Sequence, residues 1–519
     1  MSLYITTTIP YVNARPHLGH ALEFVQADVL ARHRRQRGEA VRFLTGTDDN
    51  ALKNVKAARA EGLPTAELVA RNAAWFAALR EPLELSFDDF IRTSADPRHR
   101  AGVERLWRAC ATAGDIYERS YEGLYCVGCE QFLTPAELVD GHCPEHLVAP
   151  EPVAERNWFF RLSRYADRLA ALIDDGELRI VPDPRRNEIR ALIAAGLEDF
   201  SISRSAERAH GWGIEVPGDP SQIVYVWWDA LGNYVTALDY GGGGDAYRRW
   251  WVEAAERVHV LGKGVIRFHA LYWPALLLSA GEPLPTTLFV HDYLTVKGRK
   301  ISKSLGNTVE PAGLVARFGT DAVRWWLLRE PPRVGETDFT VDRLVTRHDT
   351  ELANELGNLV HRTVSLVWRL RDGRVPESCA QTPLDAVCRG VGERVSAALA
   401  NFDFRGALDA IWSIVTQGNR YVEATRPWEL ADASRSGKRE DADVVLAGLV
   451  RACRDLAGHL APFLPSASAR LGAQLGAGAG RDGGHVPRPS WVFPRLSDER
   501  GRQRGGHRLR ASPGLSSSG

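Results

Sequence analysis

The sequence is poor in lysine. Of its 65 basic residues only seven are lysine, and three of those (Lys297, Lys300 and Lys303) lie within seven residues, in the segment KGRKISKSLGN (297–307). A lysine ammonium is a compact charge on a flexible stem, whereas the arginine guanidinium is a planar fork. We therefore interpret the segment as a loop whose ammonium groups follow a phosphate; the alternative is an ordinary solvated basic turn.

Net charge and long hydrophobic runs are also missing. Lys+Arg and Asp+Glu are equal at 65 each, so no overall field attracts nucleic acid, and any contact with RNA must come from local patches. No apolar run reaches the ~20 residues of a membrane span, and MSLYITTTIPYV lacks the basic start of a signal peptide. The seven cysteines, four of them isolated, do not resemble a disulfide framework. We expect a cytoplasmic protein that does not bind membranes.

The order of predicted elements indicates an α/β protein of several domains, since single cores stop growing at roughly 250–300 residues. Strands at 3–10 and 41–48, each followed by a helix, are typical of a Rossmann-type, doubly wound parallel sheet, which binds ligands at the carboxyl ends of its strands. Apolar residues at helical spacing after 345 predict an all-α helix bundle. The predicted organisation is a catalytic domain in two halves (1–115 and 225–285) split by a connective insert (116–224), then a strand–loop module (286–344), the helix bundle (345–475) and a tail expected to be disordered (476–519).

The motif HLGH (His17–His20) falls where a predicted strand hands over to a helix. Backbone N–H groups at a helix start favour an anion, and nearby imidazoles add donors. Gly19 would let a flat base approach the backbone closely. By itself the motif is explained equally well by ordinary surface histidines. Together with the distant lysine loop it indicates a nucleotide site.

Four residues in the insert have the spacing of a zinc knuckle: Cys126-x2-Cys129 and Cys143-x2-His146. Such a set supplies all four ligands of a tetrahedral structural site, with no position left for water. The alternatives are disulfides or a redox pair. His142 is another candidate ligand, but it would break the spacing.

Two aromatic segments, 225–234 and 268–273, are expected to face the same crevice as HLGH. Aromatic clusters mostly form core, but here they suggest a small apolar pocket with one or two polar groups. His269 is explained equally well as a core histidine and as a pocket residue.

HLGH and KISKS together resemble the paired signatures of class I aminoacyl-tRNA synthetases. The resemblance is closest to methionyl-tRNA synthetases, and it extends in family order from about residue 3 to 465. It rests on the segments IPYVNARPHLGH, FLTGTD, YEGLYCVGCEQF, CPEH, DFSISR, YVWWDAL, GRKISKSLGN, ELGNLVHRT and NRYVEATRPWEL. The interval between the two halves of the sheet is too short for the large editing domain of the relatives that use Leu, Ile or Val.

The resemblance implies residue roles. Asp48 would hold the α-ammonium of methionine, and Arg204 would help to activate ATP. The methionine pocket would be lined by Ile9, Tyr11, Trp227, Ala230, Leu231, Tyr234, Val265, His269 and Trp273. ATP would be bound by His17, Gly19, His20, Lys300 and Lys303. The CAU anticodon of tRNA(Met) would be read by Asn354, Asn358, Arg362 and Trp428.

The implied activity is ATP-dependent methionine–tRNA ligation by a monomer, with one structural Zn²⁺ and with Mg²⁺ carried by ATP. The alternatives are a class I synthetase of another specificity and a catalytically silent, synthetase-like RNA-binding protein. Three departures from the family pattern concern Asn50-Ala51, Gly264 and Val265. They affect the expected affinity for ATP and for inhibitors, and would suit an inhibitor-tolerant second copy of the enzyme.

Overall fold

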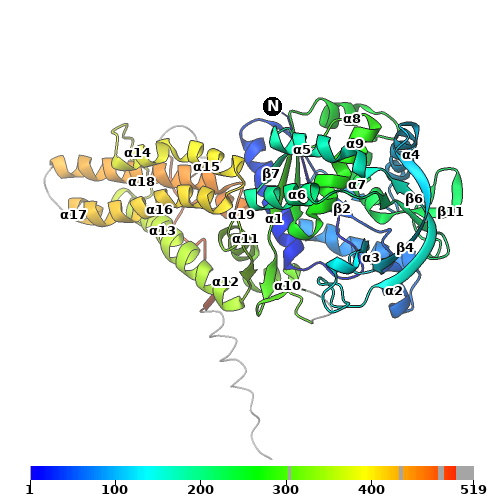
Figure 1. Cartoon of the computed structure of the whole chain (residues 1–519). Coiled ribbons are helices and arrows are strands. Elements are labelled where there is room, and N and C mark those ends of the chain that lie inside the picture. Colours follow the sequence, from blue (N-terminus) through cyan, green and yellow to red (C-terminus); the bar gives the residue numbers. More distant parts are fainter. Residues whose placement is uncertain (1, 302–305, 432–435, 477–483, 498–519) are drawn as a thin grey trace, which may run out of the picture. The chain divides into compact units, whose positions relative to one another are not determined.

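The computed structural model describes residues 2–301, 306–431, 436–476 and 484–497 (Figure 1). The chain divides into two compact units. Unit 1 contains residues 1–294, 300–312 and 333–336, and unit 2 contains residues 295–299, 313–332 and 337–519. None of the described helices is long and apolar enough to cross a membrane.

Unit 1 is built on a six-stranded parallel sheet with the strand order β3-β2-β1-β12-β13-β7. Its central strands β1 (Ser2–Thr7), β2 (Ala40–Thr47), β12 (Glu256–Gly262) and β13 (Thr287–His291) are almost fully buried. Continuous burial is expected of parallel strands that helices cover on both faces. The predicted doubly wound sheet is confirmed.

The first helix, α1 (Leu18–Gln36), follows β1, and α2 (Leu52–Glu61) follows β2. Both helices therefore begin at the carboxyl ends of neighbouring strands. The helix α7 (Val226–Thr236) packs against the π-helical turn η6 (Phe268–Tyr272), which continues into α9 (Trp273–Ala280). The predicted aromatic segments are thus helical, and their rings enter the main core of unit 1.

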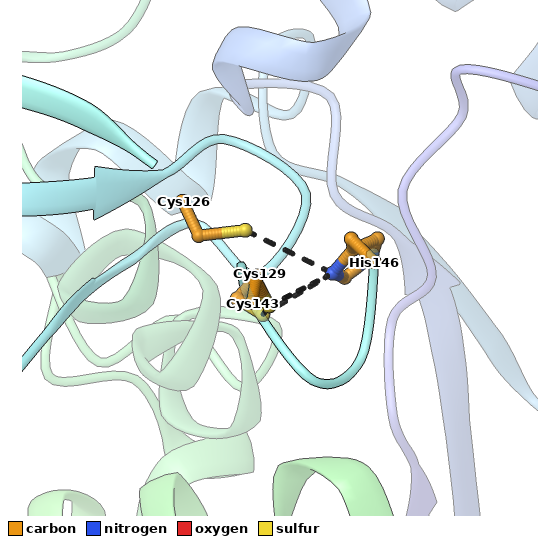
Figure 2. Close-up of side chains that lie close together, drawn as sticks. All are labelled: Cys126, Cys129, Cys143 and His146. Atoms are coloured by element: carbon orange, nitrogen blue, oxygen red, sulfur yellow. Dashed lines mark hydrogen bonds between the residues drawn. The ribbon is translucent and has the colours of Figure 1, made fainter. Parts of the chain in front are cut away.

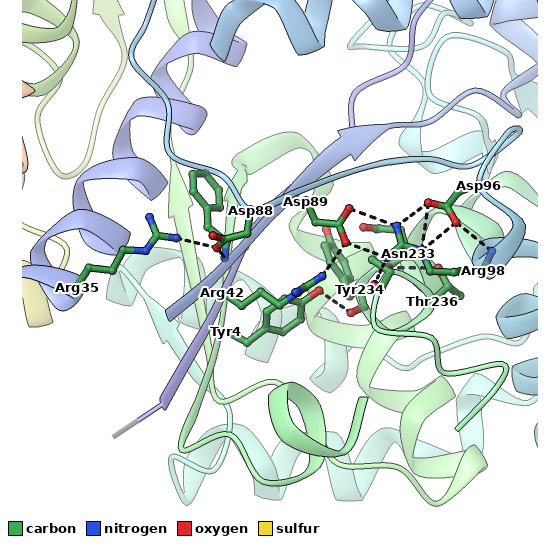
Figure 3. Close-up of polar contacts among 12 residues, drawn as sticks. Tyr4, Arg35, Arg42, Asp88, Asp89, Asp96, Arg98, Asn233, Tyr234 and Thr236 are labelled. Atoms are coloured by element: carbon green, nitrogen blue, oxygen red, sulfur yellow. Dashed lines mark hydrogen bonds and ion pairs between the residues drawn. The ribbon is translucent and has the colours of Figure 1, made fainter. Parts of the chain in front are cut away.

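The position of α7 is fixed by a polar network that reaches the sheet (Figure 3). Arg98, in α4 (Pro97–Thr112), donates to Asp89 at 2.9 Å and to the carbonyl oxygen of Ala237 just after α7, at 2.7 Å. Arg42 of β2 donates to the same Asp89 at 2.8 Å. The Tyr4 hydroxyl of β1 donates to the carbonyl oxygen of Tyr234 at 2.8 Å. These bonds fix the position of α7 relative to β1 and β2.

The insert is smaller than the predicted span of 116–224. Its own part is a four-stranded antiparallel sheet in the order β5-β4-β6-β8. The long strands are β4 (Ile116–Cys126) and β6 (Glu151–Phe160), and the short ones are β5 (Gln131–Leu133) and β8 (Phe200–Ser201). A small sheet follows in the order β10-β11-β9, made of β9 (Ser203–Ser205), β10 (Glu215–Val216) and β11 (Asp219–Val224). By contrast, β7 (Arg179–Val181) pairs in parallel with β13 and is the edge strand of the main sheet. The flanking helices α5 (Ala166–Asp174) and α6 (Asp183–Ala194) accompany it. A strand of three residues gives no periodic signal, which is why the sequence did not reveal this return to the sheet.

Unit 2 is mainly helical, as predicted. It begins with the short sheet β15-β14-β16, made of β14 (Leu294–Val296), β15 (Arg299–Lys300) and β16 (Thr337–Asp338). It continues into α11 (Thr320–Arg329), α12 (Val341–Arg347), the π-helix η8 (His348–Gly357) and α13 (Asn358–Arg371). The bundle is completed by α14 (Pro383–Arg389), α15 (Val391–Ala400), α16 (Phe404–Thr425), α17 (Pro427–Ala431), α18 (Ser436–Leu460) and α19 (Pro465–Gln474).

The expected disorder of the tail is wrong for residues 484–497. Val486, Phe493 and Leu496 of this segment are buried, and the Trp368 indole of α13 donates to the carbonyl oxygen of Pro487 at 2.5 Å. A few apolar anchors spaced along an otherwise polar segment are enough to dock it on an existing helix surface, and composition alone does not reveal them.

Candidate active site

The HLGH motif forms the start of α1. His17 is the N-cap, and its Nδ1 accepts from the N–H of Gly19 at 3.1 Å, while Nδ1 of His20 accepts from the N–H of His17 at 3.1 Å. The two rings stack with centroids 3.8 Å apart. Because both Nδ1 atoms accept, a neutral ring carries its proton on Nε2. Burial lowers the pKa of His20 well below its usual value, so that ring is a neutral donor at physiological pH.

Gly19 has a local packing role. A Cβ at this position would lie 2.9 Å from the His17 ring, so a larger residue would break the cap that the two histidines form. The glycine thus preserves the geometry of the motif, in addition to the close base approach expected from the sequence.

The segment that follows the lysine-rich sequence returns to this helix start. The N–H of Leu18 donates to the carbonyl oxygen of Val309 at 2.9 Å, and Arg15 lies 3.7 Å from Glu310. Lys300 ends β15 (Arg299–Lys300), whereas Lys303 lies outside the described residues. The segment immediately after KISKS is therefore adjacent to HLGH.

Asp48 lies at the end of β2 and is almost fully buried. Its N–H donates to the carbonyl oxygen of Pro10 at 2.9 Å, and its Oδ1 accepts from the N–H of Asn50 at 3.1 Å. Burial, reinforced by the negative charges of Asp229, Glu130 and Asp49, raises the pKa of Asp48 well above its usual value.

The neighbouring carboxylates each have a basic side chain as a partner. Asp49 accepts from Arg92 at 2.8 Å, Glu130 lies 3.4 Å from Arg204, and Asp229 is paired with His99. Asp48 has no ion pair among the residues that the structure describes. An unpaired carboxylate in a buried site calls for a cation from outside the protein.

Aromatic rings surround this carboxylate. The rings of Tyr11 and Trp227 meet edge to face at 6.2 Å, and Trp227 stacks on Phe268 at 3.7 Å. The Tyr11 hydroxyl and the Trp227 indole N–H are buried and have no hydrogen-bond partner in the described part of the chain. Buried polar groups are normally paired, so these two atoms are available to a bound molecule.

His269 is buried and bonded within the protein. Its Nδ1 donates to the carbonyl oxygen of Val265 at 2.9 Å, so its Nε2 accepts from the Tyr234 hydroxyl at 2.7 Å. Burial lowers its pKa to about 4. His269 therefore sets the direction of the Tyr234 hydroxyl as a neutral ring. Trp273 is fully buried and donates to His259 at 3.2 Å.

The remaining predicted pocket residues fall in the same core. Ala230 and Leu231 are buried on α7, and Ile9 and Val265 are partly buried and pack against the rings. Their role in lining a methionine pocket stays a prediction.

Arg204 lies on β9 (Ser203–Ser205), buried beside Glu130 and 5.7 Å from the centres of the Tyr125 and Tyr225 rings. No described contact joins it to the histidine motif. The contacts that are present place Arg204 between the Asp48 region and the insert.

The predicted zinc ligands converge in the insert (Figure 2). The ligand atoms of Cys126, Cys129, Cys143 and His146 all lie within 4.8 Å of one another. Cys129 Sγ is 3.5 Å from Cys143 Sγ and 3.2 Å from His146 Nδ1. Tetrahedral ligands at zinc bond lengths are separated by roughly 3.3–3.8 Å. This donor set fits one tetrahedral metal ion, and the cysteines form no disulfide.

Two departures from the family pattern have a physical explanation. A Cβ at Gly264 would lie 2.0 Å from the Tyr293 hydroxyl, so the tyrosine occupies the space that a side chain at 264 would need. Asn50 donates from Nδ2 to Asp229 at 2.6 Å. It thereby links the turn after Asp48 to α7.

The four expected anticodon positions lie in unit 2. Asn354 is in η8, and Asn358 and Arg362 are in α13. Trp428 is half-buried in α17, just after a helix break in which Arg426 adopts a left-handed φ of 42°. The break before Trp428 was expected from Pro427.

Sequence reasoning assigned no role to several residues of the site: Lys53, His99, Glu130, Asp229 and Tyr293. Asp229 is within the quoted segment YVWWDAL, whereas Lys53, whose Nζ lies 3.8 Å from the centre of the Tyr11 ring, has no motif of its own. Such contacts arise only when segments distant in the sequence pack together.

A family model described as "tRNA synthetases class I (M)" matches residues 3–149 and 146–364. With the parallel sheet and the capped histidine motif, this match makes the chain a class I aminoacyl-tRNA synthetase. It is 38% identical over 517 residues to the methionine–tRNA ligase of Caldanaerobacter subterraneus, covering 96% of this chain and 80% of that protein. It is 40% identical over 516 residues to that of Mycobacterium bovis, covering 95% and 97%.

Solved structures agree. Mycobacterium tuberculosis methionyl-tRNA synthetase in complex with methionyl-adenylate matches with a TM-score of 0.90 and 39% identity, covering 95% of this chain and all of that one. The apo form of that enzyme matches with a TM-score of 0.84. The chain belongs to the methionyl-tRNA synthetase family.

Proposed function

We propose that the chain activates L-methionine with ATP and transfers the methionyl group to the 3′ end of tRNA(Met). The observation that supports this most strongly is the charge arrangement at the carboxyl end of the sheet. Each of Asp49, Glu130 and Asp229 is paired with a basic side chain, and Asp48 has no such pair among the described residues. The α-ammonium of an amino acid supplies the missing charge.

The side chain of methionine enters the aromatic pocket beside Asp48. A thioether makes favourable contacts with aromatic rings, and Trp227 and Tyr11 provide such rings. The Tyr234 hydroxyl, directed by His269, is a polar group in the same core. Val265 helps to define the size of the pocket. That this valine marks an inhibitor-tolerant second copy of the enzyme stays a prediction.

ATP binds at the start of α1. The helix N-terminus and the Nε2–H donors of its histidines face the phosphates, and Lys300 and Lys303 supply positive charge as pyrophosphate develops. The methionine carboxylate attacks the α-phosphorus and pyrophosphate leaves; no base is needed, because the carboxylate is already ionised. Positioning and charge stabilisation then supply the catalysis. Mg²⁺ accompanies ATP. Arg204, ion-paired with Glu130, supports ATP activation as a positioning residue.

In the second step the terminal ribose hydroxyl of tRNA attacks the carbonyl carbon of the adenylate, and AMP leaves. The CAU anticodon is read by Asn354, Asn358, Arg362 and Trp428. Asn358 and Arg362 are four residues apart on α13, so they share one helix face. We expect the enzyme to act as a monomer, in the cytoplasm where tRNA is charged.

The cluster of three cysteines and His146 would hold one Zn²⁺. All four ligands come from the protein, so the metal would be structural and would fix the fold of the insert. Glu130 adjoins Cys129 and accepts from the Lys53 N–H at 2.9 Å, which links the insert to α2.

The proposed specificity is tested by ATP–pyrophosphate exchange measured with each of the twenty amino acids. Methionine should drive exchange at least a hundred-fold better than leucine, isoleucine or valine. Exchange driven by another amino acid would indicate a synthetase of different specificity. No exchange with any of them, while tRNA still binds, would indicate a silent RNA-binding relative.

The proposed metal is tested by elemental analysis. The purified protein should contain one zinc per chain, and Cys126→Ser should lose it and lower the melting temperature. Cys110→Ser, which changes a buried cysteine outside the cluster, is the matched control and should retain the zinc. Wild-type protein without zinc, purified in the absence of chelators, would contradict the proposal.

A further inference from the structure

The segment 484–497, here called the C-terminal strap, is docked on the helices that carry the proposed anticodon residues. Asp349 of η8 accepts from the N–H of Leu496 at 2.8 Å and from that of Ser497 at 3.0 Å. Phe493 is buried and lies edge to face against His348. The strap is therefore anchored at its end by backbone hydrogen bonds and by an apolar side chain.

Trp491 lies in the middle of the strap and is 57% exposed. It is the only aromatic side chain among the exposed large hydrophobic residues of the described chain. Its ring stacks on His361 of α13 with parallel planes and centroids 3.9 Å apart. The indole is thus held flat against a second ring, and much of its surface is open to solvent. A further flat ring can stack on that open surface.

The residues around this ring pair include arginines and residues that we propose to read the anticodon. His361 directly precedes Arg362 and lies one helical turn after Asn358. Arg495 of the strap donates to Oδ1 of Asn354 at 2.5 Å. Because arginine can only donate, this bond fixes the Asn354 amide with its NH₂ group directed away from Arg495. The carboxylate of the acidic neighbour Asp349 already accepts hydrogen bonds from the strap backbone.

We propose that Trp491, backed by His361, is a further stacking site for an unpaired nucleobase of the tRNA anticodon loop, and that Arg495 is a positioning residue for Asn354. This inference rests on the proposed function. Single-stranded RNA is bound by stacking its splayed bases on aromatic rings beside basic groups. A ring already fixed on one face by an imidazole loses little freedom when a base covers the other.

The test uses the full-length protein and a 17-nucleotide RNA hairpin that carries a CAU loop, with binding followed by fluorescence anisotropy. Stacking contributes ~1–3 kcal/mol per base, so Trp491→Ala should weaken binding about 5- to 150-fold. Trp491→Phe retains a stacking ring and should recover most of the affinity. His361→Ala removes the backing ring but leaves the Asp349 and Phe493 anchors, and should weaken binding by a smaller factor.

Arg394→Ala, a change of an exposed arginine on α15, is the control for general loss of positive charge and should bind as the wild type does. Melting temperatures show whether each variant keeps its fold. Wild-type affinity for Trp491→Ala, or equal losses for the Ala and Phe variants, would overturn the stacking site.

A reference variant separates this inference from the proposed function. If Arg362→Ala weakens hairpin binding and Trp491→Ala does not, the strap is only structural and the anticodon assignment stands. If Arg362→Ala binds normally while Trp491→Ala weakens binding, the assignment of Arg362 fails and the stacking site stands. If neither variant weakens binding, both fail.

Discussion

The proposed methionine pocket and the proposed anticodon face offer their ligands different physical environments. In the first, Asp48 is buried among aromatic rings and three further carboxylates, each paired with a basic side chain. In the second, Arg362 and Trp428 are half-buried on helix surfaces, and Trp491 is exposed. Under the proposed function, the first site would select by one buried carboxylate without an ion pair among the described residues, and the second by stacking and hydrogen bonding in contact with water.

This difference determines how sensitive each site is to change. A buried charge pair depends on a low local dielectric, so loss of one partner costs much more than loss of one exposed contact. The pocket should therefore respond steeply to single substitutions. The anticodon face, where several contacts share the binding energy, should respond in smaller steps and only in assays that contain tRNA.

The largest effect is expected for Asp48→Asn. Removing one partner of a buried charge pair costs ~2–5 kcal/mol, so methionine-dependent exchange should fall on the order of a thousand-fold. The same change should raise the melting temperature of the ligand-free protein. The raised pKa of Asp48 means that its contribution to stability is present at low pH and lost as the pH rises through that pKa.

Two controls accompany this variant. Asp88→Asn removes a carboxylate that pairs with Arg35 at the opposite end of the sheet, and should leave exchange within about twofold. In the wild type, KM for methionine should rise as the pH falls through the raised pKa of Asp48, because the protonated acid no longer attracts the ammonium. A KM independent of pH between 4 and 8 would argue against this role.

The second effect concerns Lys303, whose charge would be needed mainly in the transition state under the proposed function. Lys303→Ala should lower kcat of exchange by roughly 10²–10³, with little change in the Kd of methionine. Lys303→Arg should remain impaired, since a planar fork does not replace a compact ammonium. Near-normal exchange by the arginine variant would contradict the interpretation of the retained lysines. Lys438→Arg is the matched control and should behave as the wild type.

The smallest effect is expected on the anticodon face. Trp428→Ala should lower aminoacylation roughly ten- to a hundred-fold, since a stacking ring contributes ~1–3 kcal/mol, while exchange without tRNA stays nearly constant. Trp412→Phe changes a buried bundle tryptophan and is the contrasting control, expected to lower the melting temperature. If Trp428→Ala lowers the melting temperature and depresses both assays equally, Trp428 is a core residue.

The elements that gave strong local signals were predicted well. The strand before HLGH, the helix that follows it and the Cys/His spacing depend on short-range patterns, and the structure confirms all three. The edge strand β7 and the C-terminal strap were missed. Both are short segments whose conformation is stabilised by a distant partner, β13 in one case and α13 in the other.

By itself, the sequence determined the class of fold and the family, and it named candidate residues for the chemistry, because periodicity and motif spacing are encoded locally. Only the tertiary structure decided which carboxylates are paired with basic side chains. Asp48 has no ion pair within the described part of the chain, whereas Asp49, Glu130 and Asp229 are paired with Arg92, Arg204 and His99, which reach the site from three other segments. Electrostatic environment is a property of three-dimensional packing, and no linear spacing records it.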